Sequence, residues 1–185
     1  MNKQWIACVL MAAFLSVFKV SDAHAVIVNL NVLDSHIEVG EDFGVEVWVD
    51  SEGLGEALLA FGFDVTTSGS SFSYLGHVIG NGFDDLSGLL SSADVSGDAF
   101  PGISDDNVRL ATLNFSADSV GIDTLALDGA YDGVYFGLFY EWSGFDILAS
   151  IDIAVLERSV PEPSTLALVA IVWVLLSARR RLNLN

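Results

Sequence analysis

The residue types that usually carry out catalysis are few in this chain of 185 residues, and their spacing fits no familiar site. His36 and His77 are the only histidines beyond residue 25, and they lack the H-x-x-x-H and H-E-x-x-H spacings of helical zinc sites. The serines have no G-x-S-x-G context, and no glycine loop fits a nucleotide. We therefore predict no catalytic residue, no metal ligand and no enzyme. A carboxylate pair that hydrolyses glycosides is the alternative.

Acidic residues are so numerous that they single out no site. Asp and Glu total 25 against 7 Lys and Arg, a formal net charge of -18. Residues 26–160 contain 23 carboxylates and only Arg109 and Arg158, a net charge of -21. Such a surface repels nucleic acid and anionic lipid, so we expect neither as a partner of this region.

One long acidic segment, residues 80–106, is rich in small residues and is expected to be a loop or insertion. Its carboxylates could gather around a hard cation such as calcium, although they do not follow the D-x-[DN]-x-[DN]-G pattern. Solvated loop residues are the alternative, and no cofactor is otherwise expected. The carboxylates are those of Asp84, Asp85, Asp94, Asp98, Asp105 and Asp106.

Aromatic residues offer a binding surface instead of a catalytic one. The run YDGVYFGLFYEWSGF is especially rich in them, and flat rings on a sandwich can stack against sugars. Tyr140 and Trp142 are the residues that we expect to bind carbohydrate. Core packing and cross-strand pairing are the alternative for each aromatic residue. The full set comprises Trp48, Tyr74, Tyr131, Tyr135, Tyr140 and Trp142.

The elements that carry these residues are predicted to be strands. Between residues 26 and 157 apolar residues recur at every second position, as in Val45, Val47 and Val49, and Gly, Asp and Ser clusters separate the runs. No stripe with a period of 3.6 residues is visible there. Residues 26–157 are therefore predicted to fold as an all-β antiparallel sandwich.

The first 25 residues have the three parts of a secretory signal peptide. Lys3 precedes an apolar run at residues 5–18, and Ala23 and Ala25 provide the small residues of a cleavage site. A retained signal anchor is the alternative. Cys8, the sole cysteine, lies in this predicted signal helix. Cleavage of the signal peptide therefore leaves a chain without disulfides or thiolate sites.

The segment 158–185 has the layout of a short membrane signal. The prolines of Pro161-Glu162-Pro163 hold that strip extended, and an apolar helix is expected over residues 164–178. Its core at residues 166–178 reaches about 20 Å as a helix, against about 30 Å of hydrocarbon. We expect Arg179, Arg180 and Arg181 to stay cytoplasmic, which places the acidic region outside.

The run VPEPSTLAL, the apolar stretch and ARRR together resemble the PEP-CTERM sorting signal, which is also named the ice-binding protein C-terminal motif. The resemblance implies that an exosortase, an integral-membrane cysteine transpeptidase, recognises Pro161-Glu162-Pro163 and cuts there. It also implies transient anchoring in the inner membrane, followed by transfer to the cell surface or the extracellular matrix. A plain C-terminal anchor is the alternative. Ice binding is not expected, because no repeated T-x-T face is present.

Two further stretches, VGEDFGVEVWVDSEGLGEALLAFGFDV and VRLATLNFSADSVGIDTLAL, resemble the cohesin-like domains of exported bacterial proteins over residues 27–156. The resemblance implies a nine-stranded jelly-roll sandwich, the fold that cohesins share with carbohydrate-binding modules. Classical cohesins bind dockerins, but the sequence shows no dockerin, so that function is not carried over. TTSGSS replaces the D-P-x-x-L run that is common after the F-D strand, so the family's loop at that place is not carried over either. We expect a non-enzymatic structural or adhesion protein of a biofilm or exopolysaccharide matrix, with polysaccharide binding as the alternative.

Overall fold

The computed structural model describes residues 26–51, 53–89, 92–158 and 173, and within them the chain folds into antiparallel strands. Nine strands have four or more residues, as expected from the cohesin resemblance, and three more have two residues each. They are β1 (Ile27–Val32), β2 (Ile37–Glu38), β3 (Asp42–Asp50), β4 (Leu58–Thr67), β5 (Phe72–Ile79), β6 (Asp84–Asp85), β7 (Val95–Ile103), β8 (Asn107–Ala117), β9 (Gly121–Gly129), β10 (Gly137–Tyr140), β11 (Gly144–Phe145) and β12 (Ile147–Leu156).

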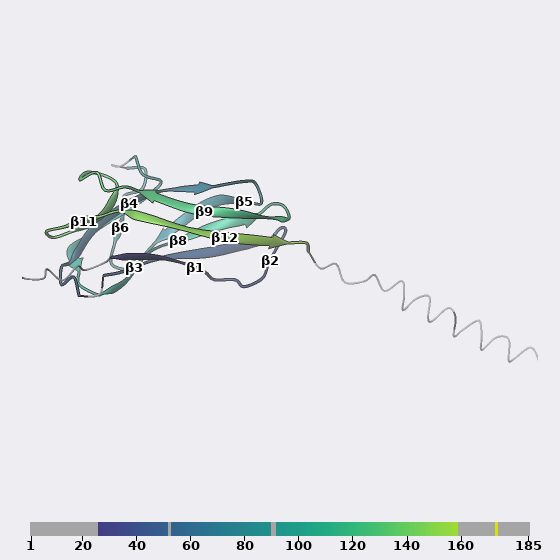
Figure 1. Ribbon diagram of the computed structural model, residues 1–185, viewed down its shortest axis with the longest axis horizontal. Coiled ribbons are helices and arrows are strands. Elements are labelled where there is room, and N and C mark those ends of the chain that lie inside the picture. The colour runs from purple at the N-terminus through teal and green to yellow at the C-terminus, as the bar shows by residue number, and fades with distance from the viewer. Residues whose placement is uncertain (1–25, 52, 90–91, 159–172, 174–185) are drawn as a thin grey trace, which may run out of the picture.

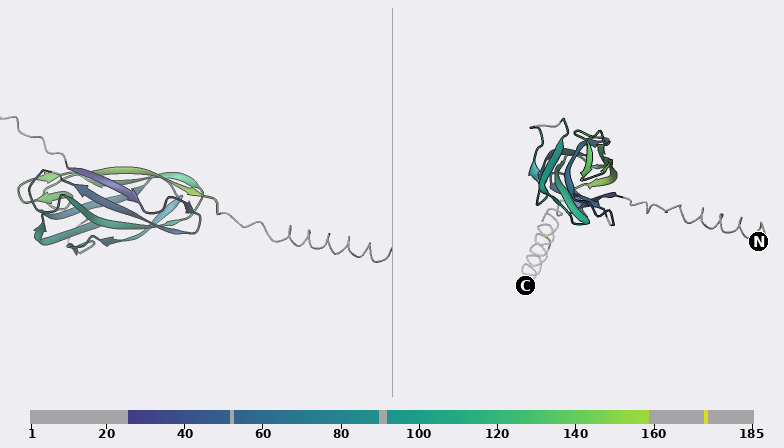
Figure 2. Two further views of the ribbon diagram at one scale, coloured as in Figure 1. Left: turned by 90° about the horizontal axis from the view of Figure 1, so that it is seen from below. Right: turned by 90° about the vertical axis from the view of Figure 1, so that its left-hand side faces the viewer.

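Two sheets face each other to form the sandwich, as the end-on view in Figure 2 shows. The four-stranded sheet has the order β1-β3-β8-β5. The eight-stranded sheet runs β11-β10-β4-β9-β12-β2, and β7 pairs with β4 and with β6. The pairing of β2 with β12 is parallel, which is the exception to the predicted antiparallel arrangement.

The core follows the period of two that the sequence displays. Val45, Val47 and Val49 of β3 are fully buried, while Glu46 and Trp48 lie on the opposite face. Alternation of this kind places every second side chain of a strand between the sheets. Phenylalanines fill the space between them, with Phe43, Phe72 and Phe115 in mutual ring contact at centroid distances of 5.4–5.7 Å.

The prediction that residues 80–106 form one long loop is wrong. β7 occupies nine of these residues and pairs with β4, and the short β6 pairs with β7. The alternation was hidden because the inward positions of β7 are small: Gly97 and Ala99 follow Val95. Gly97 is small for a packing reason, since a Cβ there would lie 2.9 Å from the ring of Phe61.

The two ends of the sandwich are distinguished by the end at which the chain leaves after its last strand. β12 ends at Leu156 beside β2, at the right-hand end in Figure 1, and the chain continues from there toward residue 159. We call this the proximal end. The opposite end, where β11 lies, is called the distal end.

The flanking helices lie outside the described residues. The signal helix expected over 1–25 and the membrane helix expected over 164–178 fall there, apart from residue 173. Within the part of the chain that is described, no helix is long and apolar enough to cross a membrane.

Candidate functional site at the distal end

Three segments meet at the distal end around the start of β4. On one side, the bulged part of β7 lies opposite Leu59, because the register jumps from Leu58↔Ile103 to Ala60↔Asp98. On the other side, the N–H of Glu141, in the turn after β10, donates to the carbonyl of Ala57 at 3.2 Å. The start of β4 therefore separates residues 99–102 from the turn between β10 and β11.

Trp142 stands at the tip of that turn with its indole in solvent. Its side chain is 86% exposed. The Tyr140 N–H donates to the Ser143 carbonyl at 2.9 Å, which closes the turn. The Glu56 carboxylate then accepts from the Trp142 N–H at 3.1 Å and from the Ser143 hydroxyl at 2.8 Å. These bonds fix the backbone under an exposed ring, so the ring is presented at little further cost in backbone entropy.

Tyr140, which we expected to bind carbohydrate beside Trp142, is a core residue. Its side chain is 5% exposed and its ring meets Phe145 edge-on at 5.8 Å. Its hydroxyl is buried, and burial raises the pKa of this phenol, while the nearby Ser51 side chain acts in the opposite direction to a smaller extent. The expectation of an exposed ring is therefore wrong for Tyr140, because it lies two positions from Leu138 on the inward face of β10.

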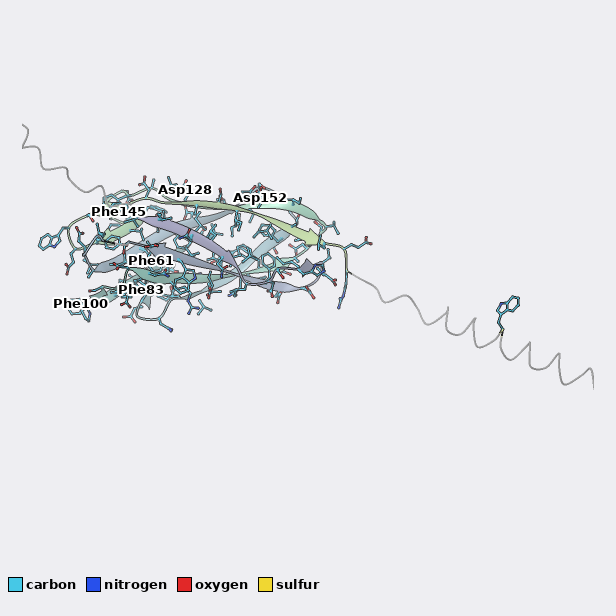
Figure 3. All side chains as sticks on the ribbon, turned by 60° about the horizontal axis from the view of Figure 1, so that its bottom comes forward. Phe61, Phe83, Phe100, Asp128, Phe145 and Asp152 are labelled. Atoms are coloured by element: carbon cyan, nitrogen blue, oxygen red, sulfur yellow. The ribbon has the colours of Figure 1, made fainter. Side chains whose placement is uncertain are left out.

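Phe100 is the exposed ring that sequence reasoning missed. It is 99% exposed in the bulged part of β7, and Figure 3 places it at the distal end. Gly102, two residues later, packs so closely against Leu59 and Ala57 that a Cβ would lie 2.7 Å and 2.9 Å from their side chains. An aromatic residue directly before a proline in a polar segment was the available signal.

Tyr131 and Tyr135 lie on a neighbouring loop, residues 130–136, and both are partly exposed. One carboxylate oxygen of Asp132 accepts three backbone N–H groups, those of Val134 and Tyr135 at 2.7 Å and that of Phe136 at 3.1 Å. These N–H groups, led by that of Tyr135, lower the pKa of Asp132. Asp132 thus braces the loop, and the Tyr131 N–H adds a bond of 2.8 Å to the Asp146 carboxylate.

Two glycines allow this loop to lie flat on the sheet. The Tyr135 carbonyl oxygen rests against the Cα of Gly62, where any side chain would collide with it. The Tyr131 ring covers Gly144 in the same way and packs against Phe139 at a centroid distance of 5.2 Å. Tyr131 and Tyr135 therefore lie in a loop that packs against the sheet, whereas the side chains of Trp142 and Phe100 project into solvent.

Trp48 lies on another surface, the outer face of the four-stranded sheet. Its indole N–H donates to Glu46 at 3.0 Å, and Arg109 donates to the other oxygen of that carboxylate at 2.9 Å. The bond from Trp48 and the bond from Arg109 lower the pKa of Glu46. Trp48 is partly buried in this cluster, so its ring is held on the sheet and is not free to stack on a ligand.

The two histidines take part in separate contacts. His36 lies at the edge of an open hollow of about 490 Å³ at the proximal end, with Nε2 3.4 Å from Glu38. His77 Nδ1 and the Tyr74 hydroxyl form a hydrogen bond of 2.7 Å, and His77 Nε2 lies 3.5 Å from Asp85. Burial, with the nearby Asp94 and Asp85, raises the pKa of Tyr74 to about 12. The raised pKa keeps the Tyr74 phenol protonated at neutral pH, so Tyr74 is not an activated nucleophile.

The carboxylates of residues 80–106 are spread over several structural contacts. Asp94 accepts from the Val65 N–H at 3.0 Å, and Asp85 accepts from the Ser87 N–H at 2.9 Å. In the described residues no group of three or more His, Cys, Asp or Glu side chains is placed to hold a metal ion. The calcium site considered from the sequence therefore gains no geometric support.

The architecture has relatives of known structure. A cohesin module from a family 33 glycoside hydrolase of Clostridium perfringens covers 74% of this chain and all of its own, with a TM-score of 0.57 and 10% identity. The fold is that of a cohesin module. A chain of a type II cohesin–X-dockerin complex from Acetivibrio cellulolyticus is more distantly similar, with a TM-score of 0.42 and 11% identity over 73% of this chain and 97% of that one.

The cohesin-like sandwich is followed by a recognisable sorting signal. Residues 159–181 match the family described as the PEP-CTERM protein-sorting motif, which indicates an exported protein with a C-terminal sorting signal. No curated protein sequence matches the chain. Several residues named from the sequence lie outside the described residues: Ala23, Ala25, Pro161, Glu162, Pro163, Arg179, Arg180 and Arg181.

Proposed function

We propose that this protein is a non-enzymatic adhesion or structural module of the cell surface or exopolysaccharide matrix, sorted by an exosortase. The observation that carries the proposal is the PEP-CTERM motif at residues 159–181, which begins three residues after β12 ends at Leu156. The sorting signal is therefore attached to the proximal end, and the exposed rings of Trp142 and Phe100 are at the distal end.

The proposed route uses the two ends of the chain in turn. A signal peptide at residues 1–25 is removed after Ala25, and the apolar segment at 164–178 then holds the protein briefly in the inner membrane. Arg179, Arg180 and Arg181 keep the tail end in the cytoplasm. The exosortase cuts at Pro161-Glu162-Pro163 and transfers the sandwich outward.

The sorting step is tested by the mass of the mature C-terminus, measured in cells with and without the exosortase. We expect the tail with Arg179–Arg181 to be absent from the wild-type protein and retained when the enzyme is missing. Replacing Pro161 and Pro163 by Ala should also retain it, whereas Glu157→Gln, before the motif, should not. An intact tail on protein from cells with an active exosortase would contradict the proposal.

The adhesion role has a separate readout. Deletion of residues 26–157 with both sorting segments kept should reduce cell aggregation, because the sandwich and not the tail makes the contacts. Absence of turnover on glycans is also expected, because the sequence shows no recognisable catalytic motif. Release of sugars by the purified protein would point to a hydrolase.

Polysaccharide binding is the second candidate function, and the exposure of Trp142 on a braced turn favours it. Retention of the protein on a polysaccharide affinity gel should be weaker in Trp142→Ala than in the wild type. Tyr140→Phe is the matched control and should be retained, because the Tyr140 hydroxyl is buried and cannot reach a ligand. Equal retention of Trp142→Ala and wild type would remove this candidate.

A further inference from the structure

Phe100 and Trp142 together form a two-ring surface at the distal end, on either side of the start of β4. Phe100 is 99% exposed and Trp142 is 86% exposed, values far above those of the other rings in the sandwich. Leu59, which is also exposed, lies between the two segments. We call Leu59, Phe100 and Trp142 the distal apolar site. Clustered exposed rings at one end of a soluble domain indicate a contact surface.

The spacing of the two rings suits an extended ligand. β7 and β10 pair with opposite edges of β4, and Phe100 projects from the bulged part of β7 while Trp142 projects from the turn after β10. A ligand that contacts both rings must therefore extend across β4, as successive units of a sugar chain can.

The charge around the site selects the chemistry of that chain. Glu56 holds the Trp142 turn, Glu141 precedes Trp142, and residues 26–160 carry a net charge of -21. The field of such a domain repels polyanions and attracts polycations over roughly a Debye length, about 10 Å in 0.1 M salt. A ring beside carboxylates also attracts an ammonium group directly, through its electron-rich face.

We propose that the distal apolar site binds an extended polysaccharide that bears protonated amino groups, with sugar faces on Trp142 and Phe100 and ammonium groups facing Glu56 and Glu141. The inference rests on the polysaccharide-binding function proposed above and specifies its ligand class. A second copy of this chain is the wrong occupant, because two strongly acidic domains repel each other. An acidic polysaccharide is disfavoured for the same reason.

The test compares three oligosaccharides of equal length: a glucosamine hexamer, its fully N-acetylated form, and a uronate hexamer. Binding is measured by calorimetry on the full-length chain in a zwitterionic detergent without a sugar head group, at mildly acidic pH. We expect the glucosamine hexamer to bind, the acetylated hexamer to bind more weakly and the uronate hexamer not to bind. Raising the salt from about 0.05 M to about 0.5 M should weaken binding of the glucosamine hexamer.

Variants locate the site. Trp142→Ala and Phe100→Ala should each weaken binding about two- to fivefold, and Trp142→Phe should keep most of it. Ile122→Ala is the control, since Ile122 is also strongly exposed, at 71%, but begins β9 at the proximal end. Both rings are in solvent, so thermal unfolding of these variants should match the wild type.

Several outcomes would overturn the inference: no binding of the glucosamine hexamer, equal binding of its acetylated form with no effect of salt, or full binding by both alanine variants. These outcomes are independent of the sorting proposal, which depends on the mass of the C-terminus. If only the acetylated hexamer bound, polysaccharide binding would remain a candidate function, but the proposed preference for protonated amino groups would be wrong.

Discussion

The carboxylate of Glu56 accepts a hydrogen bond from the backbone N–H of Trp142 at 3.1 Å, across 86 positions of sequence. The same oxygen accepts from the hydroxyl of Ser143 at 2.8 Å. One side chain before β4 therefore fixes the turn after β10. The exposed ring of Trp142 depends on this contact for its position.

Removal of the Glu56 carboxylate should loosen the turn without unfolding the sandwich. We expect Glu56→Ala to lower the free energy of unfolding by about 1 kcal/mol, because hydrogen bonds to a partly exposed charged group are lost. Hydrogen exchange of the Trp142 amide should become about tenfold faster. Glu141→Ala removes the same charge one residue from Trp142 and should leave that amide protected. Unchanged exchange in Glu56→Ala would contradict the bracing role.

Asp132 should be required for the shape of loop 130–136. Asp132→Asn keeps an acceptor oxygen but removes the negative charge that attracts three N–H groups, so exchange of the Val134, Tyr135 and Phe136 amides should accelerate. Because these bonds lower the pKa of Asp132, the wild-type loop should stay protected down to pH values below the ordinary 3.8 and loosen only as pH falls further. Asp128→Asn, at an exposed position of β9, is the control. Equal exchange in both variants would contradict this assignment.

Glu46 should make stability depend on pH in acid. The bonds from Trp48 and Arg109 depress its pKa below the ordinary 4.5, so their stabilisation is complete above that value and is lost as pH falls through the depressed pKa. At neutral pH the free energy of unfolding of the wild type should be about 1 kcal/mol higher than that of Glu46→Gln. Urea unfolding at successive pH values should show this difference shrinking below pH 4.5. A difference that stays constant into acid would contradict the assignment.

The strand character of β7 can be tested by a small residue that faces the core. Gly97→Val should cost about 1–3 kcal/mol, because the new side chain meets the Phe61 ring where a Cβ alone would lie at 2.9 Å. Asp98→Thr, on the adjacent outward position, should change stability by less than about 0.5 kcal/mol. Chemical denaturation compares the two. Similar values would fit a solvated loop and not a strand.

The sequence predicts those parts of the fold in which large apolar residues alternate. Val45, Val47 and Val49 identify both β3 and its buried face, and the all-β sandwich follows from several such runs. β7 escapes the same reasoning because its inward positions hold Gly97 and Ala99, which carry little hydrophobic signal. The small size of Gly97 is set by the Phe61 ring on the neighbouring strand β4, which a local pattern cannot reveal.

The candidate site was predictable only in part. Trp142 follows from its place in an aromatic run, and the same run contains the signal that Tyr140 is buried, since Leu138 precedes it by two positions. Phe100 could not be placed because the bulge between Leu58 and Ala60 interrupts the alternation. Glu56 carries no local signal, because its role arises from the pairing of β4 with β10.

The separation of the two ends sets how copies of this protein would act as a group. Arg158 follows β12 at the proximal end, whereas Phe100 and Trp142 lie at the distal end, so attachment through the C-terminal side of the sandwich leaves both rings at the opposite end of the domain. Copies held side by side on one surface would then present their rings at a similar distance from that surface. A long chain crossing several tips gains effective concentration after the first contact, so weak individual binding becomes firm collective retention. Mutual repulsion between acidic neighbours would keep those tips apart.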